Sequence, residues 1–122
     1  MVSESELREI LEEFVKSAGV IGAAIVSKEG LMMCSLLPED SDPSLVAAMS
    51  ASLFGTSKKV VEELSLGPLQ QAIVEAKEGK LVACSAGKYG ILVSLVPHTT
   101  NIGLVILELG KTSERIRRLL EE

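Results

Sequence analysis

The residue types that could do chemistry are few in this sequence, and they stand apart from one another. Gly110-Lys111-Thr112 has the form of the end of a phosphate-binding loop, but Val105 occupies the position where such a loop needs its first glycine. His98 is the only histidine, and no cysteine stands near it at metal-ligand spacing. The sequence therefore predicts no nucleotide triphosphatase and no zinc or iron site.

The cysteines and the adjacent carboxylates also favour structural interpretations. Cys34 and Cys84 lie in apolar segments, where a free cysteine usually packs as a small hydrophobic residue in a reducing cytoplasm. Glu62 and Glu63 are neighbours on a predicted helix, so their side chains point to different sides and face solvent. No Gly-x-Ser-x-Gly sequence is present. We therefore expect neither an enzyme nor a cofactor.

Length and composition narrow the class of protein further. The chain has 122 residues, enough for one domain, which we expect to span 1–122. Hydrophobic residues make up 47% of it, but aromatic residues make up only 2%, too few for a base-stacking surface. The net charge of −5 also disfavours nucleic acid as a partner. No apolar run reaches the ~18 to 20 residues that cross a bilayer, so we expect a cytoplasmic protein without a membrane span.

Hydrophobic periodicity and end signals predict the elements in order. A helix over 4–17 begins with a Ser3/Glu6 capping box and ends before Gly19. A second helix begins at Asp42-Pro43 and runs for about 24 residues, because nothing breaks its pattern earlier. Strands are expected at 20–27, 31–37, 69–77, 81–86 and 89–96.

The polarity of these strands predicts their places in one antiparallel sheet. Segment 89–96 is almost wholly apolar and 20–27 is apolar on both faces, so we place both in the middle. Segment 69–77 carries several glutamine, glutamate and lysine residues, so we place it at an edge. An unpaired edge invites pairing with another chain.

The long helix is rich in small residues around its middle. Met49 and Leu53 belong to an apolar stripe, while Gly55 and neighbouring alanine, serine and threonine residues let another helix or a sheet approach closely. Gly55 weakens the helix by about 1 kcal/mol, which some packing must offset. Two interpretations stay open: the helix simply lies on its own sheet, or it also contacts a second copy of itself.

The last segment is ambiguous. Residues 102–109 fit either a sixth strand or the start of a helix that begins near Asn101, and we favour the helix. Arg115, Arg117 and Arg118 follow as candidates for contacting a partner protein, although interspersed glutamates also suit an ordinary solvated helix face. The small-residue helix, the edge strand and this basic tail together favour a role in contacting other proteins.

The whole pattern resembles the Roadblock/LC7 family in its MglB-like branch. The predicted order is helix, hairpin, long helix, three-stranded meander and helix. Residues 19–27, GVIGAAIVS, followed by Gly30-Leu31, are similar to the family's first hairpin. Residues 101–105, NIGLV, are similar to the start of its final helix.

This resemblance implies an α+β, profilin-like α/β sandwich of order αββαβββα. Its five-stranded antiparallel sheet carries the long helix on one face and the terminal helices on the other. Members typically dimerise by pairing the third strand, here 69–78, with the long helices side by side. The interface candidates are Met49, Leu53, Gln71, Ile73 and Glu75.

The resemblance also implies a function. Members act as regulators or scaffolds of small Ras-like GTPases, so we expect a homodimer that binds such a GTPase and adjusts its nucleotide cycle or localisation. Stabilising the GTPase's switch loops, or recruiting it, is favoured over donating an arginine. Two alternatives stay open: a profilin-like or PAS-like sensor holding a small molecule between sheet and helix, and a dimeric adaptor without a GTPase.

Overall fold

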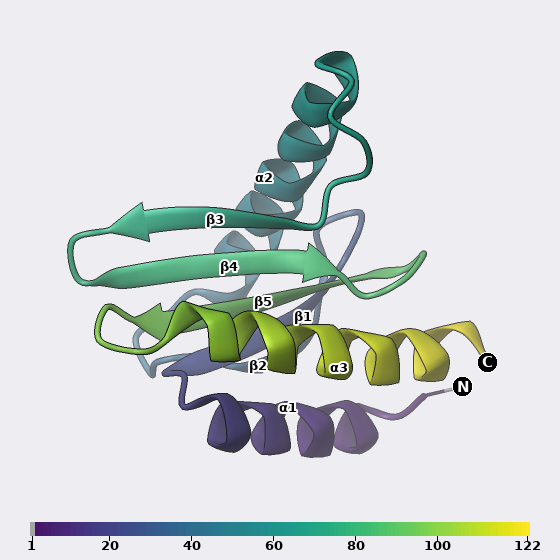
Figure 1. Cartoon of the computed structure of the whole chain (residues 1–122). Coiled ribbons are helices and arrows are strands. Elements are labelled where there is room, and N and C mark those ends of the chain that lie inside the picture. The colour runs from purple at the N-terminus through teal and green to yellow at the C-terminus, as the bar shows by residue number, and fades with distance from the viewer. Residues whose placement is uncertain (1) are drawn as a thin grey trace.

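A computed structural model describes residues 2–122 and contains the predicted elements in the predicted order. Their bounds are α1 Glu4–Ala18, β1 Gly22–Ser27, β2 Met32–Leu36, α2 Pro43–Glu63, β3 Gln71–Ala76, β4 Gly79–Ser85, β5 Gly90–Pro97 and α3 Ile102–Glu121. Figure 1 shows the whole chain. The ambiguous stretch 102–109 is helical, because Asn101 caps it by accepting a hydrogen bond from the Gly103 N–H.

The five strands form one antiparallel sheet in the order β2-β1-β5-β4-β3. The prediction that 89–96 and 20–27 lie in the middle and that 69–77 lies at an edge is confirmed. Burial follows this order, since Gly22 to Val26 of β1 are buried throughout, whereas most of β3 is exposed.

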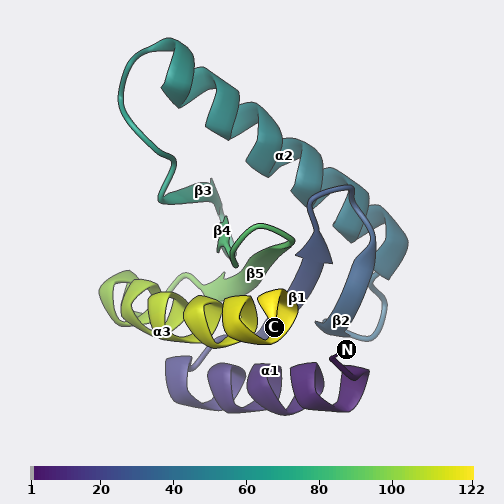
Figure 2. The same cartoon turned by 90° about the vertical axis from the view of Figure 1, so that its right-hand side faces the viewer.

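The sheet is covered by α2 on one face and by α1 and α3 on the other, as Figure 2 shows from the side. Side-chain alternation along the strands supplies both layers. In β1, Ala23 and Ile25 pack with Phe14 of α1 and Ile116 of α3. Ala24 and Val26, which point the other way, pack with Phe54 of α2. The α+β sandwich expected from the sequence is confirmed.

The helix ends follow their predicted signals, with one difference. The Ser3/Glu6 capping box is present, and Gly19 ends α1 with φ 68°. The second helix has 21 residues and is shorter than expected. It stops because Ser65 adopts a left-handed conformation with φ 56°, which lets the Leu66 N–H bond back to the Val61 carbonyl.

Candidate protein-interaction surface

The contact between α2 and the sheet is narrow. Only Ala47, Ser50 and Phe54 of this helix are buried. A Cβ on Gly30 would lie 3.4 Å from the Ala48 Cα, so the β1–β2 turn and the helix backbone approach closely here. The helix therefore lies on its own sheet, as one interpretation held, but it leaves most of its surface uncovered.

An apolar stripe runs along the uncovered side of α2. Met49 is 63% exposed and Val60 is 50% exposed, although both are large hydrophobic residues. Leu45 and, just beyond the helix, Leu64 are also exposed, and Leu53 is half-buried on the same side. Exposed apolar side chains that form a continuous stripe indicate a contact surface more strongly than scattered ones do.

Strand β3 supplies an unpaired edge beside this stripe. It pairs only with β4 among residues 2–122, through a two-residue loop closed by Ala76 opposite Gly79. In such a hairpin the closing pair is hydrogen-bonded, and hydrogen-bonded and non-hydrogen-bonded pairs then alternate. The backbone N–H groups of Gln71, Ile73 and Glu75 therefore point outward, away from β4. These are the three strand residues that were expected at an interface.

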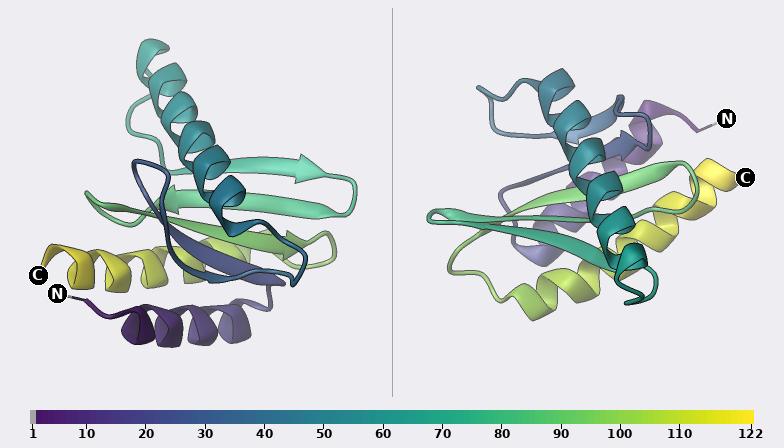
Figure 3. Two further views of the ribbon diagram at one scale, coloured as in Figure 1. Left: turned by 180° about the vertical axis from the view of Figure 1, so that it is seen from behind. Right: turned by 90° about the horizontal axis from the view of Figure 1, so that it is seen from above.

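A groove joins the helix stripe to the edge strand. Its volume is about 370 Å³, and its walls include Leu53 and Val60 of α2 and Ile73 and Val74 of β3. Figure 3 shows α2 crossing the strands, and Figure 1 shows its C-terminal end extending past β3. The groove is thus open along the free edge of the sheet. Met49 borders a second hollow on the helix, of about 420 Å³, which shares Leu53.

The three arginines expected to contact a partner lie far from this groove, on α3, and each holds an ion pair within the chain. Arg115 pairs with Glu13 at 2.7 Å, and Arg118 pairs with Glu114 at 3.5 Å. Arg117 lies between two carboxylates and pairs with Glu114 and Glu121. A hydrogen bond from Arg117 holds the pKa of the Glu114 carboxyl below its ordinary value. Their use by a partner stays a prediction.

The two cysteines lie in the interior of the domain, as expected for cysteines in apolar segments. Cys34 and Cys84 are buried, and burial raises the pKa of both thiols, that of Cys84 to about 11. No cluster of three or more histidine, cysteine, aspartate or glutamate side chains within residues 2–122 could hold a metal ion. Over the same residues, no helix combines the length and the apolar character that crossing a bilayer requires.

Sequence reasoning missed two parts of the surface. Val74 of β3 is 43% exposed and lines the groove. It was not among the interface candidates, because a valine in a strand is as often buried in the core. A separate cavity is lined by Lys28, Lys58 and Ser85. These residues are far apart in the sequence, so no motif predicts that they meet. Strand alternation could have identified Val74, but no local signal joins the other three.

Comparison with known proteins agrees with this architecture. The family model of the Roadblock/LC7 domain matches residues 6–95. The uncharacterized protein MJ1340 of Methanocaldococcus jannaschii is 34% identical over 110 residues, which cover 90% of this chain and 96% of that protein. The structure of the gliding protein MglB from Thermus thermophilus has a TM-score of 0.88 at 20% identity and covers 99% of this chain and 94% of that one.

A more distant fold is also similar. Profilin IB of Acanthamoeba castellanii has a TM-score of 0.66 at 11% identity, covering 88% of this chain and 94% of that one. At these identities the two structural similarities establish the profilin-like fold alone. The family model spans most of the chain, and the archaeal relative matches nearly all of it. The chain therefore belongs to the Roadblock/LC7 family.

Proposed function

We propose that this protein is a non-catalytic homodimer that binds a small Ras-like GTPase and modulates its nucleotide cycle or its localisation in the cytoplasm. The observation that carries the proposal is the exposed stripe of α2 beside the unpaired edge of β3, in a chain of the Roadblock/LC7 family. A contact surface of this kind suits a protein that acts by binding a partner.

Pairing of two β3 strands would form the proposed dimer. Antiparallel pairing centred on Ile73 would use the outward N–H and C=O groups of Gln71, Ile73 and Glu75 and turn two five-stranded sheets into one. The same arrangement would bring together two α2 helices through Met49 and Leu53. Both edges and both apolar stripes would be covered in one step, which a symmetric two-fold interface achieves.

The GTPase is acted on through binding rather than through a donated arginine. An arginine finger must be free to reach the phosphates, where it accelerates hydrolysis by about 10³ to 10⁵. Arg115, Arg117 and Arg118 hold ion pairs within the chain, and Arg8 donates to the Ser35 carbonyl at 3.4 Å. We therefore expect the protein to stabilise the switch loops of its GTPase or to recruit it.

The decisive experiment uses purified small Ras-like GTPases from the cell that makes this protein. Binding, nucleotide release and GTP hydrolysis are measured for each GTPase with and without the full chain. Saturable binding to one of them is expected, with a changed rate for a regulator and an unchanged rate for a scaffold. Replacing all four arginines named above by lysine should leave any rate effect in place. If none of the GTPases binds the dimer, the proposal is wrong and an adaptor role in another complex replaces it.

A further inference from the structure

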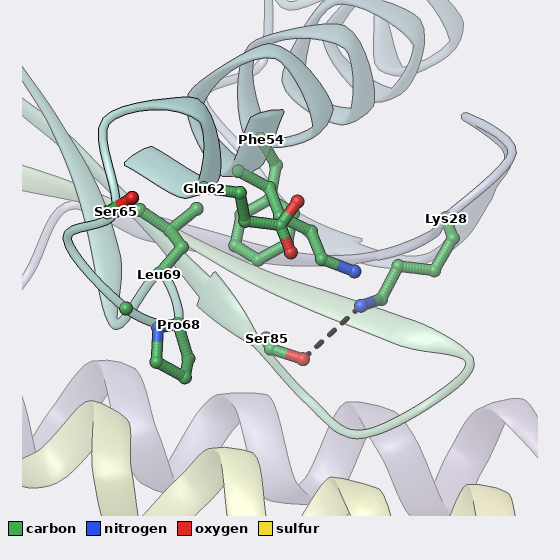
Figure 4. A pocket seen from close by; sticks show the side chains of 9 residues that line it. Lys28, Phe54, Glu62, Ser65, Pro68, Leu69 and Ser85 are labelled. Carbon is green, nitrogen blue, oxygen red and sulfur yellow. Dashed lines mark hydrogen bonds between the residues drawn. The ribbon is translucent and has the colours of Figure 1, made fainter. Parts of the chain in front are cut away.

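The cavity that brings Lys28, Lys58 and Ser85 together lies on a different side of α2 from the groove beside β3, although Leu69 lines both. It has a volume of about 480 Å³, within the range of small-molecule sites. Figure 4 shows it between the C-terminal half of α2, the turn after β1, the end of β4 and the loop before β3. Its lining includes Lys28, Phe54, Lys58, Glu62, Leu69 and Ser85.

The walls of this cavity divide into an apolar part and a basic part. Phe54, Pro68 and Leu69 supply apolar and aromatic surface, and the exposed wall is mainly apolar. Lys28 enters from the β1–β2 turn, and its Nζ lies 5.1 Å from the centre of the Phe54 ring. The second lysine, Lys58, lies one helical turn after Phe54 on the same side of α2.

The ammonium group of Lys28 has unused donor capacity. It donates to the Ser85 Oγ at 3.3 Å (Figure 4). The Ser85 hydroxyl donates in turn to the Gly87 carbonyl at 3.0 Å. An ammonium group has three N–H donors, so this single oxygen leaves the others for a ligand or water. Neither Lys28 nor Lys58 forms an ion pair within 4.0 Å in the part of the chain that the structure describes.

The charge of the cavity favours one negative charge. Two lysines and Glu62 give a local charge of about +1 in a chain whose net charge is −5. Burial, and after it the nearby positive charge of Lys58, lower the pKa of Lys28. An anion between the two ammonium groups would relieve this repulsion, and the Glu62 carboxylate at the rim opposes a second negative charge.

We propose that this cavity binds a small monocarboxylate with an apolar body, whose carboxylate lies between Lys28 and Lys58 and whose apolar part packs on Phe54, Pro68 and Leu69. We expect the site to stay open in the proposed dimer. Phe54, Lys58 and Glu62 follow one another at intervals of four residues on a side of α2 that differs from the side of Met49 and Leu53. The proposal therefore does not depend on the dimer or on the GTPase.

The test uses octanoate as the probe and the full-length protein labelled for NMR. Calorimetry gives the affinity, and amide shifts locate the site. Octanoate is expected to bind saturably and to shift the amides of the cavity residues, whereas octanol, with the same chain and no charge, should bind at least about ten-fold more weakly. Inorganic phosphate should bind more weakly than octanoate because it has no apolar body.

Three substitutions make the test specific. Lys28→Met and Lys58→Met remove the ammonium group but keep an unbranched side chain of similar length. Each should weaken octanoate binding by about ten-fold, the effect of losing one charge-assisted hydrogen bond. Lys59→Met is the matched control, because Lys59 adjoins Lys58 on α2 but does not line the cavity. Since Lys58 is exposed, Lys58→Met keeps the test valid if Lys28→Met does not fold. The proposal is overturned if octanoate does not bind saturably in the millimolar range, if octanol or phosphate binds equally well, or if Lys59→Met weakens binding as much as Lys58→Met.

Discussion

The Arg115 guanidinium donates a hydrogen bond of 2.7 Å to the Glu13 carboxylate, and this ion pair joins α3 to α1. The two side chains are 49% and 52% exposed, so water screens their attraction. We expect Arg115→Ala to lower the free energy of unfolding by only about 0.2–1 kcal/mol. A double-mutant cycle with Glu13→Ala, measured by urea unfolding, isolates the coupling between the two residues. A coupling well above this range would show that the pair is shielded from solvent, for example by a second copy.

Gly87 is required where the end of β4 meets α3. Its φ is 85°, and a Cβ there would collide with the Arg117 Cγ and with the carboxylate of Glu121. The same carboxylate accepts a hydrogen bond of 2.8 Å from the Lys88 N–H. We expect Gly87→Ala to cost about 1–3 kcal/mol through backbone strain and the loss of this contact.

The control for this substitution is Gly110→Ala. Gly110 lies inside α3, and a Cβ there would meet no atom within 4 Å. We expect this change to stabilise the helix by about 1 kcal/mol. Urea unfolding of both variants checks the contrast. If Gly87→Ala were as stable as the natural protein, Arg117 would not pack closely over this turn in solution.

Ser94 is a fully buried serine in the middle of the sheet. It lies on β5 between Ala23 of β1 and Val82 of β4, and its Oγ has no hydrogen-bond partner among the described residues. Burying an unpaired hydroxyl costs about 1–3 kcal/mol, so Ser94→Ala should raise the free energy of unfolding by about 1 kcal/mol. Thermal and urea unfolding measure this. A loss of stability instead would mean that the hydroxyl is paired, for example by a buried water molecule.

The element order and the sheet were predictable because their signals are local. Gly19, Asp42 and Asn101 end or begin helices through contacts within a few residues, and the apolar run of 89–96 marks a central strand. The end of α2 was misjudged because Ser65 adopts a left-handed conformation that is more typical of glycine. No local sequence signal predicts this conformation, because serine seldom adopts it.

The candidate surfaces divide in the same way. The outward direction of the Ile73 N–H follows from its position in the β3–β4 hairpin. Strand polarity and family resemblance selected this residue as an interface candidate, and its use by a second copy stays a prediction. The cavity beneath α2 depends on Lys28 meeting Ser85, which is 57 positions away. Periodicity within one element cannot reveal such a contact, because it is set by how β1 and β4 are ordered in the sheet.

Cys84 should make stability depend on pH in the alkaline range. Burial raises the pKa of its thiol from 9.0 to about 11, although a hydrogen bond with Ser113 acts in the opposite direction. The folded state therefore keeps the proton after the unfolded state has lost it. The resulting stabilisation is complete below about pH 9 and is lost as the pH rises to about 11, a total of roughly 3 kcal/mol.

Comparison with Cys84→Ala isolates this effect from every other change that alkaline pH causes in the protein. Urea unfolding of both proteins at several values between about pH 8 and pH 11 is the measurement. The difference between the two free energies should shrink as the pH rises. Parallel curves would mean that the Cys84 thiol titrates normally in the folded state.

The homodimer should depend on the backbone N–H of Ile73 more than on its side chain. The pairing alternation in the β3–β4 hairpin directs this N–H outward, so Ile73→Pro should leave the bonds to β4 intact while removing a donor from the free edge and adding a ring that clashes with an incoming strand. Light scattering after gel filtration should therefore show a monomer for Ile73→Pro and a dimer for the natural protein. Ile73→Val keeps the N–H and should remain a dimer. If Ile73→Pro eluted as a folded dimer, two copies would meet through another surface, such as Met49 and Leu53 of α2 alone. Met49→Asp should then produce the monomer.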